Sequence, residues 1–334
     1  MVLSERKVVI TGVGSLSSVG KGSDEHFQNL LDGVSGLETM PEWADEYPCR
    51  VGCLVKDFTA SDWMDKRESR RQGRYTHFGM AASRMAITDA GLDLDAVDKD
   101  RFGVIVGSGI GGVEFFEDSC QRFFGAGGGG AGLKKVSPFL IPALISNTAS
   151  GIIAIETGAR GPNYGVVSAC ATGTHAIGDA LDFLLHGDAD VMIAGGSEAA
   201  MTPLCFAGFA SMRAMVQTFN DEPTRASRPF DVDRAGFVMG EGAGVIIMET
   251  EEHALARGAD IYCEVVGYGA TCDAHHITAP APDGNGLARA IKMAMDRGGM
   301  KPEDMEGGYI NAHGTSTPYN DKFETMAIKR CLGK

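Results

Sequence analysis

Several features that mark other classes of protein are missing from this sequence. Its 334 residues contain no apolar run close to the roughly 18 residues of a membrane-spanning helix. The first apolar run begins at Val8, and no secretory or transit segment precedes it. We therefore expect a protein without a membrane span.

Positive charge and paired cysteines are also scarce. The 30 Lys and Arg residues are outnumbered by 44 Asp and Glu residues, which gives a net charge of −14 at pH 7. Nonspecific nucleic-acid binding is not expected, because attraction to phosphate needs a positive surface. The 8 cysteines are dispersed, and the close pair Cys49 and Cys53 has no matching second pair. We predict no metal site, no disulfide framework and a reducing compartment.

What the sequence does contain is an alternation of short apolar runs with helix-like stretches. The clearest helical stretches are Thr76–Ala90 and Thr174–Leu185. The predicted strands, mostly continuous apolar runs as in strands buried on both faces, are Val8–Thr11, Val104–Val106, Val166–Ser168, Val191–Ala194, Val245–Met248, Glu264–Val266 and Tyr309–Ile310. This order predicts an α/β fold with mixed or parallel sheets. The glycine run Gly125–Gly132 is interpreted as a flexible surface loop.

A candidate nucleophile lies in the segment GPNYGVVSACATGTHAIGDA. A strand-like run, Tyr164–Ser168, leads to Cys170, and a helix-like stretch follows. At such a turn the helix dipole and free backbone N–H groups stabilise a thiolate and can hold an oxyanion. A buried, inert cysteine is the alternative that these residues leave open. His175 is interpreted as a packing residue and His186 as a residue at the helix C-terminus.

A candidate catalytic histidine lies in the segment YINAHGTSTPYNDKFE. A short apolar strand delivers His313 to a Gly, Thr, Ser and Pro turn, the kind of loop that carries catalytic groups, although a structural histidine is equally compatible. Thr315 and Thr317 alternate, so their hydroxyls are expected on one side of an extended segment, where they could bind a polar substrate arm. Asp321 and Glu324 are interpreted as capping or salt-bridging residues at a helix start.

Together these segments resemble the β-ketoacyl-[acyl carrier protein] synthase family, in its long-chain type II branch. The resemblance runs from Val8 to the last residue through collinear motifs: KVVITGVGSLSSVG, VGSGIGGV, KKVSPFLIPALISNTASG, the cysteine segment, GDADVMIAGGSEA, ASRPFDVDRAGFVMGEGAGV and NAHGTSTPYNDKFET. It implies a thiolase-like, five-layered αβαβα fold with two similar halves, residues 1–255 and 256–334, the second incomplete. A weak echo between KVVITGVG and CEVVGYGA agrees with two halves.

The resemblance also implies a reaction, a decarboxylating Claisen condensation in fatty acid elongation by an acyltransferase that acts as a homodimer. Cys170 would accept an acyl group from acyl carrier protein. His313 would stabilise the enolate that forms when malonyl-carrier protein loses carbon dioxide. Four more residues match positions that contact the phosphopantetheine arm or line the acyl pocket: Thr315, Thr317, Ile110 and Phe209. No metal or organic cofactor is implied.

A basic cluster, KRESRRQGR at residues 66–74, fits the same family. The expected carrier protein is strongly acidic, so a local positive patch would steer docking despite the negative total charge. Arg67, Arg70 and Arg71 match the family's docking positions, and Arg213 is a further candidate. A solvated helix face is the simpler alternative.

The sequence departs from the family in one respect. The family uses a Cys-His-His triad, and neither the Lys-Ser-Met-Thr-Gly-His segment of the second histidine nor the late Gly-Phe-Gly loop occurs here. We therefore expect a C-terminally truncated sequence whose condensation activity is impaired. The alternative function is an impaired fragment or a partner subunit of a synthase or polyketide system, and the presence of Cys170 argues against a partner subunit.

A dinucleotide-binding enzyme is the competing hypothesis. Gly107–Gly112 follows a strand and satisfies G-x-G-x-x-G, but no second strand ending in Asp or Glu follows at the expected distance. The Cys-Ala-Thr-Gly that begins at Cys170 differs from the Cys-Ser-Ser of polyketide ketosynthases and favours fatty acid synthesis. The expected compartment is the cytoplasm, with a plastid stroma as the alternative.

Overall fold

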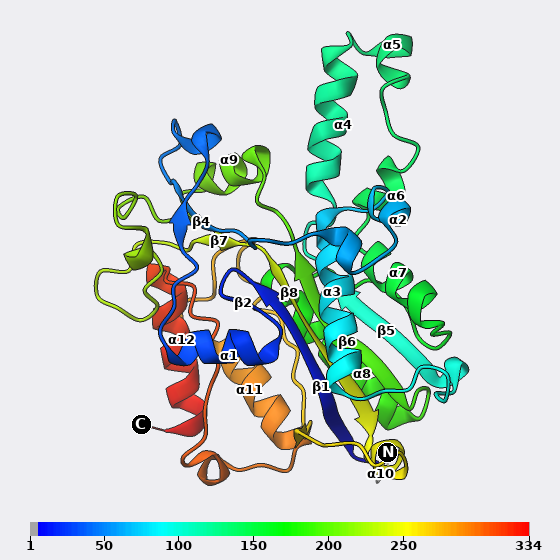
Figure 1. The fold of residues 1–334 in the computed structure, drawn as a ribbon. Coiled ribbons are helices and arrows are strands. Elements are labelled where there is room, and N and C mark those ends of the chain that lie inside the picture. Colours follow the sequence, from blue (N-terminus) through cyan, green and yellow to red (C-terminus); the bar gives the residue numbers. More distant parts are fainter. Residues whose placement is uncertain (1–5, 334) are drawn as a thin grey trace. The chain divides into compact units, whose positions relative to one another are not determined.

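The computed structural model describes residues 6–333, which form two compact units, each built from separate stretches of chain (Figure 1). Unit 1 comprises residues 6–36, Leu54–Phe206 and Gly240–Val265, and unit 2 comprises Leu37–Cys53, Ala207–Met239 and residues 266–333. None of the helices formed by residues 6–333 has the length and apolar character of a membrane span. The division into halves at residues 255 and 256 stays a prediction.

The regular elements alternate along the chain. The strands are β1 (Val8–Ser17), β2 (Gly20–Lys21), β3 (Glu38–Thr39), β4 (Val51–Cys53), β5 (Phe102–Gly107), β6 (Val191–Glu198), β7 (Met239–Gly240), β8 (Gly242–Thr250) and β9 (Cys263–Glu264). The α-helices are α1 (Ser23–Leu31), α2 (Lys66–Ser69), α3 (Arg74–Asp89), α4 (Val113–Gly125), α5 (Gly129–Leu133), α6 (Leu140–Leu144), α7 (Thr148–Thr157), α8 (Thr172–His186), α9 (Pro203–Ser211), α10 (Glu251–Ala256), α11 (Asn285–Arg297) and α12 (Pro318–Leu332). The helices predicted at Thr76–Ala90 and Thr174–Leu185 are confirmed as α3 and α8.

The large sheet lies in unit 1 and has the order β2-β1-β8-β6-β5, with β9 paired to β1. β1 and β8 are antiparallel, as are β8 and β6, whereas β5 and β6 run parallel. This mixed sheet and its helices confirm the predicted α/β class. Every residue of β5 is buried, as its unbroken apolar run predicts.

Helices cover both faces of this sheet. Glycine lets α3 approach β1 closely, because a Cβ at Gly14 would lie 1.9 Å from the carbonyl oxygen of Ala82. α3 and α7 pack together on the face to which Val106 points. α8 lies on the opposite face, where Gly173 meets Gly196, since successive residues of a strand point to opposite faces.

Unit 2 contains β3, β4, α11 and α12. β3 and β4 pair antiparallel. α11 and α12 lie side by side, and the Cys331 thiol of α12 donates to the carbonyl oxygen of Ala288 in α11. Among the described residues, the stretch 266–333 forms helices but no strand.

The strand predicted at Val166–Ser168 is wrong. The chain makes a single parallel bridge there, between Asn163 and Val104, and then leaves the sheet. The backbone N–H of Ser168 donates to the Thr172 hydroxyl at 2.8 Å. Because this donor is committed to the turn before α8, the segment cannot extend the ladder beside β5.

Three other local predictions need correction. Tyr309–Ile310 belongs to no strand, and Tyr309 is 84% exposed, so no described strand covers it. Of Glu264–Val266, only Glu264 lies in a strand, β9. The glycine run predicted as a loop is partly helical, because α5 begins at Gly129. α5 packs on α4 so closely that a Cβ at Gly132 would lie 2.7 Å from a backbone oxygen.

Candidate active site

Cys170 lies in one turn of 3-10 helix, Ala169–Ala171, directly before α8. Its side chain is exposed. Ala169 has a φ of 51°, in the left-handed region that costs a residue with a Cβ roughly 1–2 kcal/mol. The sharp turn therefore places the sulfur at the N-terminal end of a 15-residue helix, the position that the sequence predicts.

Glycines of two neighbouring strands accommodate this turn. A Cβ at Gly107, the last residue of β5, would lie 2.3 Å from the Thr172 Cγ2 atom. A Cβ at Gly196 of β6 would lie 3.2 Å from the Gly173 Cα atom. The nucleophile turn thus packs on the carboxyl ends of the parallel pair β5 and β6, the edge of α/β sheets at which ligands bind.

Ile110 lies in the loop that follows β5, and its side chain is 37% exposed. A Cβ at the neighbouring Gly109 would lie 3.7 Å from the Ala169 carbonyl oxygen, so this loop lies against the nucleophile turn. The carboxylate of Glu198 in β6 accepts hydrogen bonds from the loop. Glu198 lies in the motif GDADVMIAGGSEA, but the motif assigns it no role, because its hydrogen-bond partners come from another segment.

Two histidines near Cys170 in the sequence have the positions predicted for them. His175 is half-buried within α8. His186 is the last residue of α8, and its Nδ1 atom lies 2.7 Å from the Asp182 carbonyl oxygen.

His313 is exposed and lies in an irregular segment of unit 2, directly before α12. The backbone N–H groups of His313 and Gly314 donate to the two carboxylate oxygens of Glu324, at 2.7 and 2.9 Å. Glu324 itself is 6% exposed. The interpretation of Glu324 as a cap of its own helix is therefore wrong, because its carboxylate holds the backbone that carries the histidine.

The residues after His313 form a tight, partly buried turn. Ser316 is fully buried with a φ of 65°, and its hydroxyl accepts the Arg228 backbone N–H at 3.1 Å. The hydroxyl oxygens of Thr315 and Thr317 lie 2.9 Å apart. They therefore share one side of the segment, as their alternation predicts.

Asp321 fixes the other side of this turn. Its carboxylate is buried, accepts the Phe230 backbone N–H at 2.7 Å and lies 3.7 Å from the Arg234 guanidinium. Arg234 also donates to the carbonyl oxygen of Pro318 at 2.9 Å. The salt-bridging role predicted for Asp321 is confirmed, and it ties α12 to the segment 228–236.

The remaining predicted site residues are placed as follows. Phe209 is half-buried in unit 2, with its ring edge-on to Phe237 at 5.4 Å. Arg213 is exposed, with a φ of 56°. No described residues form a group that could hold a metal ion.

The predicted docking arginines lie in and directly after α2. Arg67 and Arg70 are exposed. Arg71 is engaged within the chain, because its guanidinium pairs with Glu68 at 2.7 Å and lies 4.7 Å from the centre of the Phe139 ring. Among the predicted positions, the exposed part of this basic patch is therefore Arg67 and Arg70.

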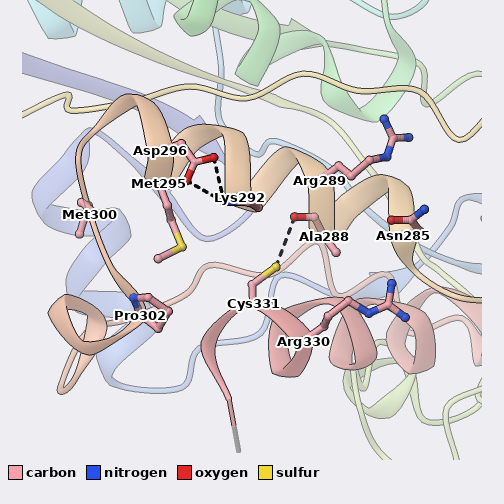
Figure 2. Close-up of a pocket in the computed structure, with 10 residues that line it drawn as sticks. All are labelled: Asn285, Ala288, Arg289, Lys292, Met295, Asp296, Met300, Pro302, Arg330 and Cys331. Carbon is pink, nitrogen blue, oxygen red and sulfur yellow. Dashed lines mark hydrogen bonds and ion pairs between the residues drawn. The ribbon is translucent and has the colours of Figure 1, made fainter.

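A cavity of about 300 Å³ lies between α11 and α12 (Figure 2). Its walls combine apolar side chains such as Met295 and Met300 with the Lys292–Asp296 ion pair. Its lining includes none of the predicted site residues. It therefore gives no support to a catalytic role for this part of unit 2.

Comparison with known families and proteins gives a consistent result. The family model described as "Beta-ketoacyl synthase, N-terminal domain" matches residues 5–254, and the corresponding C-terminal domain model matches residues 262–334. The chain is 49% identical to 3-oxoacyl-[acyl-carrier-protein] synthase 2 of Synechocystis sp. over 99% of its length and 78% of the relative. It is 46% identical to the Staphylococcus aureus protein of the same name, over 98% of this chain and 78% of that one.

Solved structures show the same fold. A type II polyketide ketosynthase, solved with its acyl carrier protein and bound to a hexaketide, is similar with a TM-score of 0.90 and 31% identity, over 98% of this chain and 78% of that one. A β-ketoacyl synthase from Burkholderia phymatum gives a TM-score of 0.89 at 32% identity, with the same coverage. These similarities confirm the predicted thiolase-like fold.

Proposed function

The chain belongs to the β-ketoacyl synthase family, and from this premise we propose that it is a 3-oxoacyl-[acyl carrier protein] synthase of type II. It condenses malonyl-carrier protein with an acyl chain bound to Cys170, with loss of carbon dioxide, in fatty acid elongation. The observation that carries the proposal is an exposed cysteine at the N-terminus of α8, in a chain 46–49% identical to synthases with this name.

The first half of the reaction is an acyl transfer. The Cys170 thiolate attacks the thioester carbonyl of acyl-carrier protein, and the phosphopantetheine thiolate leaves and takes up a proton. The positive end of the α8 dipole stabilises the thiolate and the oxyanion of the tetrahedral intermediate. Ile110 and Phe209 match the family's acyl-pocket positions, and we propose both as pocket residues.

The second half is a decarboxylation followed by carbon–carbon bond formation. Malonyl-carrier protein loses carbon dioxide, and the electron pair passes into an enolate whose oxygen accepts a hydrogen bond from His313. The enolate carbon attacks the Cys170 thioester and expels the thiolate. Thr315 and Thr317 bind the phosphopantetheine arm through their adjacent hydroxyls. The chemistry uses no cofactor beyond the arm that the substrates carry.

We propose acyl carrier protein as the partner of the Arg67 and Arg70 patch. A structural relative was solved with its acyl carrier protein, and two exposed cations in a chain of net charge −14 offer an acidic partner a local attraction. Arg71 contributes less direct contact because Glu68 engages it. Two further parts of the proposal are a homodimer and a cytoplasmic location.

The proposal is tested by mass spectrometry after exposure to cerulenin, an electrophile expected to capture the reactive cysteine of this family. We expect labelling at Cys170, and none at this position in Cys170→Ala. Cys272→Ala is the matched control, and it should keep the labelling at Cys170. Cys272 is also exposed but lies outside the nucleophile turn, so it should not be labelled comparably. Absence of labelling at Cys170 in the folded protein, or equal labelling of both cysteines, would overturn the proposal.

A partner subunit without catalysis is the second candidate. One structural relative, described as "The ishigamide ketosynthase/chain length factor", covers 98% of this chain at 34% identity. Selective labelling of Cys170 would argue against this role, because a subunit without catalysis needs no activated thiol.

A further inference from the structure

Glu198 is a half-buried carboxylate at the carboxyl end of β6, and none of the catalytic steps above uses it. We propose that Glu198 is a positioning residue, which holds the loop bearing Ile110 against the Cys170 turn and so sets which acyl chains reach the sulfur. The inference rests on the proposed function, since it concerns the acyl pocket of the same site.

Glu198 accepts hydrogen bonds from the first residues of this loop. Its Oε1 atom accepts the Ser108 hydroxyl at 3.1 Å. Its Oε2 atom accepts the backbone N–H groups of Gly109 at 2.9 Å and Ile110 at 3.1 Å. The Ser108 hydroxyl oxygen in turn accepts the Gly111 N–H at 3.0 Å. Four successive residues, Ser108 to Gly111, are thus connected to one carboxylate.

The same loop touches the nucleophile turn on its other side. A Cβ at Gly109 would lie 2.9 Å from Glu198 Oε2 and 3.7 Å from the Ala169 carbonyl oxygen. Gly109 therefore fills the space between the carboxylate and the turn. A shift of the loop toward or away from Glu198 would change the position of Ile110 relative to Cys170.

Among residues 6–333, Glu198 is the acceptor of the Gly109 and Ile110 N–H groups. Burial raises the pKa of the Glu198 carboxyl, and the hydrogen bonds from Ser108, Ile110 and Gly109 oppose that rise. Removing the carboxylate would take the acceptor away from the backbone N–H groups of half-buried Gly109 and exposed Ile110, which frees the loop to move. A glutamine, by contrast, keeps an oxygen for both N–H groups and an amide that can donate to the Ser108 hydroxyl oxygen.

The experiment measures alkylation of Cys170 by N-methyl and N-dodecyl iodoacetamide, in which the thiolate displaces iodide and forms a thioether. The readout is the ratio of the dodecyl rate to the methyl rate at Cys170, which requires no condensation. We expect the ratio to change roughly fivefold or more in Glu198→Ala, and to stay near that of the unmodified chain in Glu198→Gln. Ser108→Ala loses the hydrogen bonds of its hydroxyl to Glu198 and from Gly111 but keeps the bonds of Gly109 and Ile110 to Glu198. It should change the ratio less, in the same direction, and it replaces Glu198→Ala if that variant does not fold.

Glu249→Gln is the matched control. Glu249 is a fully buried carboxylate of the same sheet, but it lies opposite Val191 at the other end of β6. It should lower the thermal midpoint without changing the ratio. An unchanged ratio in Glu198→Ala and Ser108→Ala, or the same change in Glu249→Gln, overturns the positioning role. Absence of labelling at Cys170 in the unmodified chain overturns the proposed function itself, and the inference with it.

Discussion

A single residue holds the segment of the predicted catalytic histidine in place through its backbone rather than its side chain. In unit 2 the Glu324 carboxylate accepts the N–H groups of His313 and Gly314. An acceptor that is lost from a buried site leaves its donors unpaired, at about 1–3 kcal/mol each. The orientation of the histidine segment therefore depends on Glu324, which lies within the following helix, α12.

Glu324→Ala should slow turnover of malonyl-carrier protein about tenfold or more, because the backbone that presents His313 loses both acceptors. Cys170 labelling should not change, since the variant leaves the nucleophile turn intact. Glu303→Ala, at an exposed acidic residue of the same unit, is the control. An equal loss of turnover in the two variants would refute the role of Glu324.

At this scale the sequence predicts the candidate reactive side chains but not the groups that contact their segments. Cys170 and His313 lie in motifs whose residue types are specific. Glu198 and Glu324 are carboxylates at a strand end and in a helix, where an acidic residue usually has a local role. Their partners lie on other segments, so only the tertiary structure reveals them.

Among the elements, the contact of α3 with β1 depends most directly on the absence of a side chain. At Gly14 a Cβ would lie 1.9 Å from a backbone oxygen of α3. Backbone atoms cannot move aside as a flexible side chain can, so strand and helix must separate.

Gly14→Ala should therefore destabilise the protein by about 1–3 kcal/mol, the usual cost of overpacking. Gly244→Ala is the matched control, because a Cβ there would meet nothing within 4 Å and the residue also lies in this sheet, in β8. Urea unfolding of both variants makes the comparison. Equal midpoints would show that α3 shifts at no cost.

Strand predictions were correct where an apolar run pairs with neighbouring strands inside the sheet. They were wrong where an apolar run has no strand to pair with. β5, β6 and β8 pair with each other over most of their lengths. Val166–Ser168 is also apolar, but its backbone is committed to the turn before α8. Composition alone cannot tell a strand from a run that passes beside one without pairing.

For the whole molecule, acid stability depends on the buried Glu249. Burial raises its pKa, but hydrogen bonds from His253, Arg257 and Thr11 outweigh that effect and lower the pKa to about 2. A group whose pKa is lowered in the folded state stabilises it above the unfolded pKa. That stabilisation is lost as the pH falls from about 4.5 to about 2.

Glu249→Gln should reduce the free energy of unfolding by about 3–5 kcal/mol at neutral pH, because it leaves the buried end of Arg257 without its charge partner. It should also flatten the decline of stability below pH 4.5, the ordinary pKa of this carboxyl. Urea unfolding over a pH series checks both. A decline as steep as that of the unmodified chain would assign acid sensitivity to other carboxylates.

The net charge of −14 makes carrier docking sensitive to salt. Replacing Arg67 and Arg70 with Ser should weaken binding of acyl carrier protein, and the difference from the unmodified chain should shrink as salt screens the patch. Arg160→Ser, at a side chain 65% exposed, is the control. Binding is measured by titration at low and high salt. If the variant without Arg67 and Arg70 binds the carrier protein as Arg160→Ser does, the patch is not part of the interface.

The assembly of the whole chain is the part that the sequence predicted least. Each compact unit combines stretches far apart in sequence, such as residues 6–36 with Gly240–Val265 in unit 1. Periodicity describes local stretches, and it carries no information about which of them meet. The α/β class followed from the order of elements, whereas the composition of the units required the structure.

The left-handed backbone of Ala169 bears on how mutational data for this chain should be interpreted. In a saturation library over residues 166–172, Ala169 should accept glycine and asparagine but reject valine, isoleucine and threonine, because β-branched side chains are strained at a φ of 51°. A tolerance map would then mark Ala169 almost as strongly as Cys170. Intolerance at Ala169 would then reflect backbone geometry, whereas intolerance at Cys170 would reflect the chemistry of its thiol.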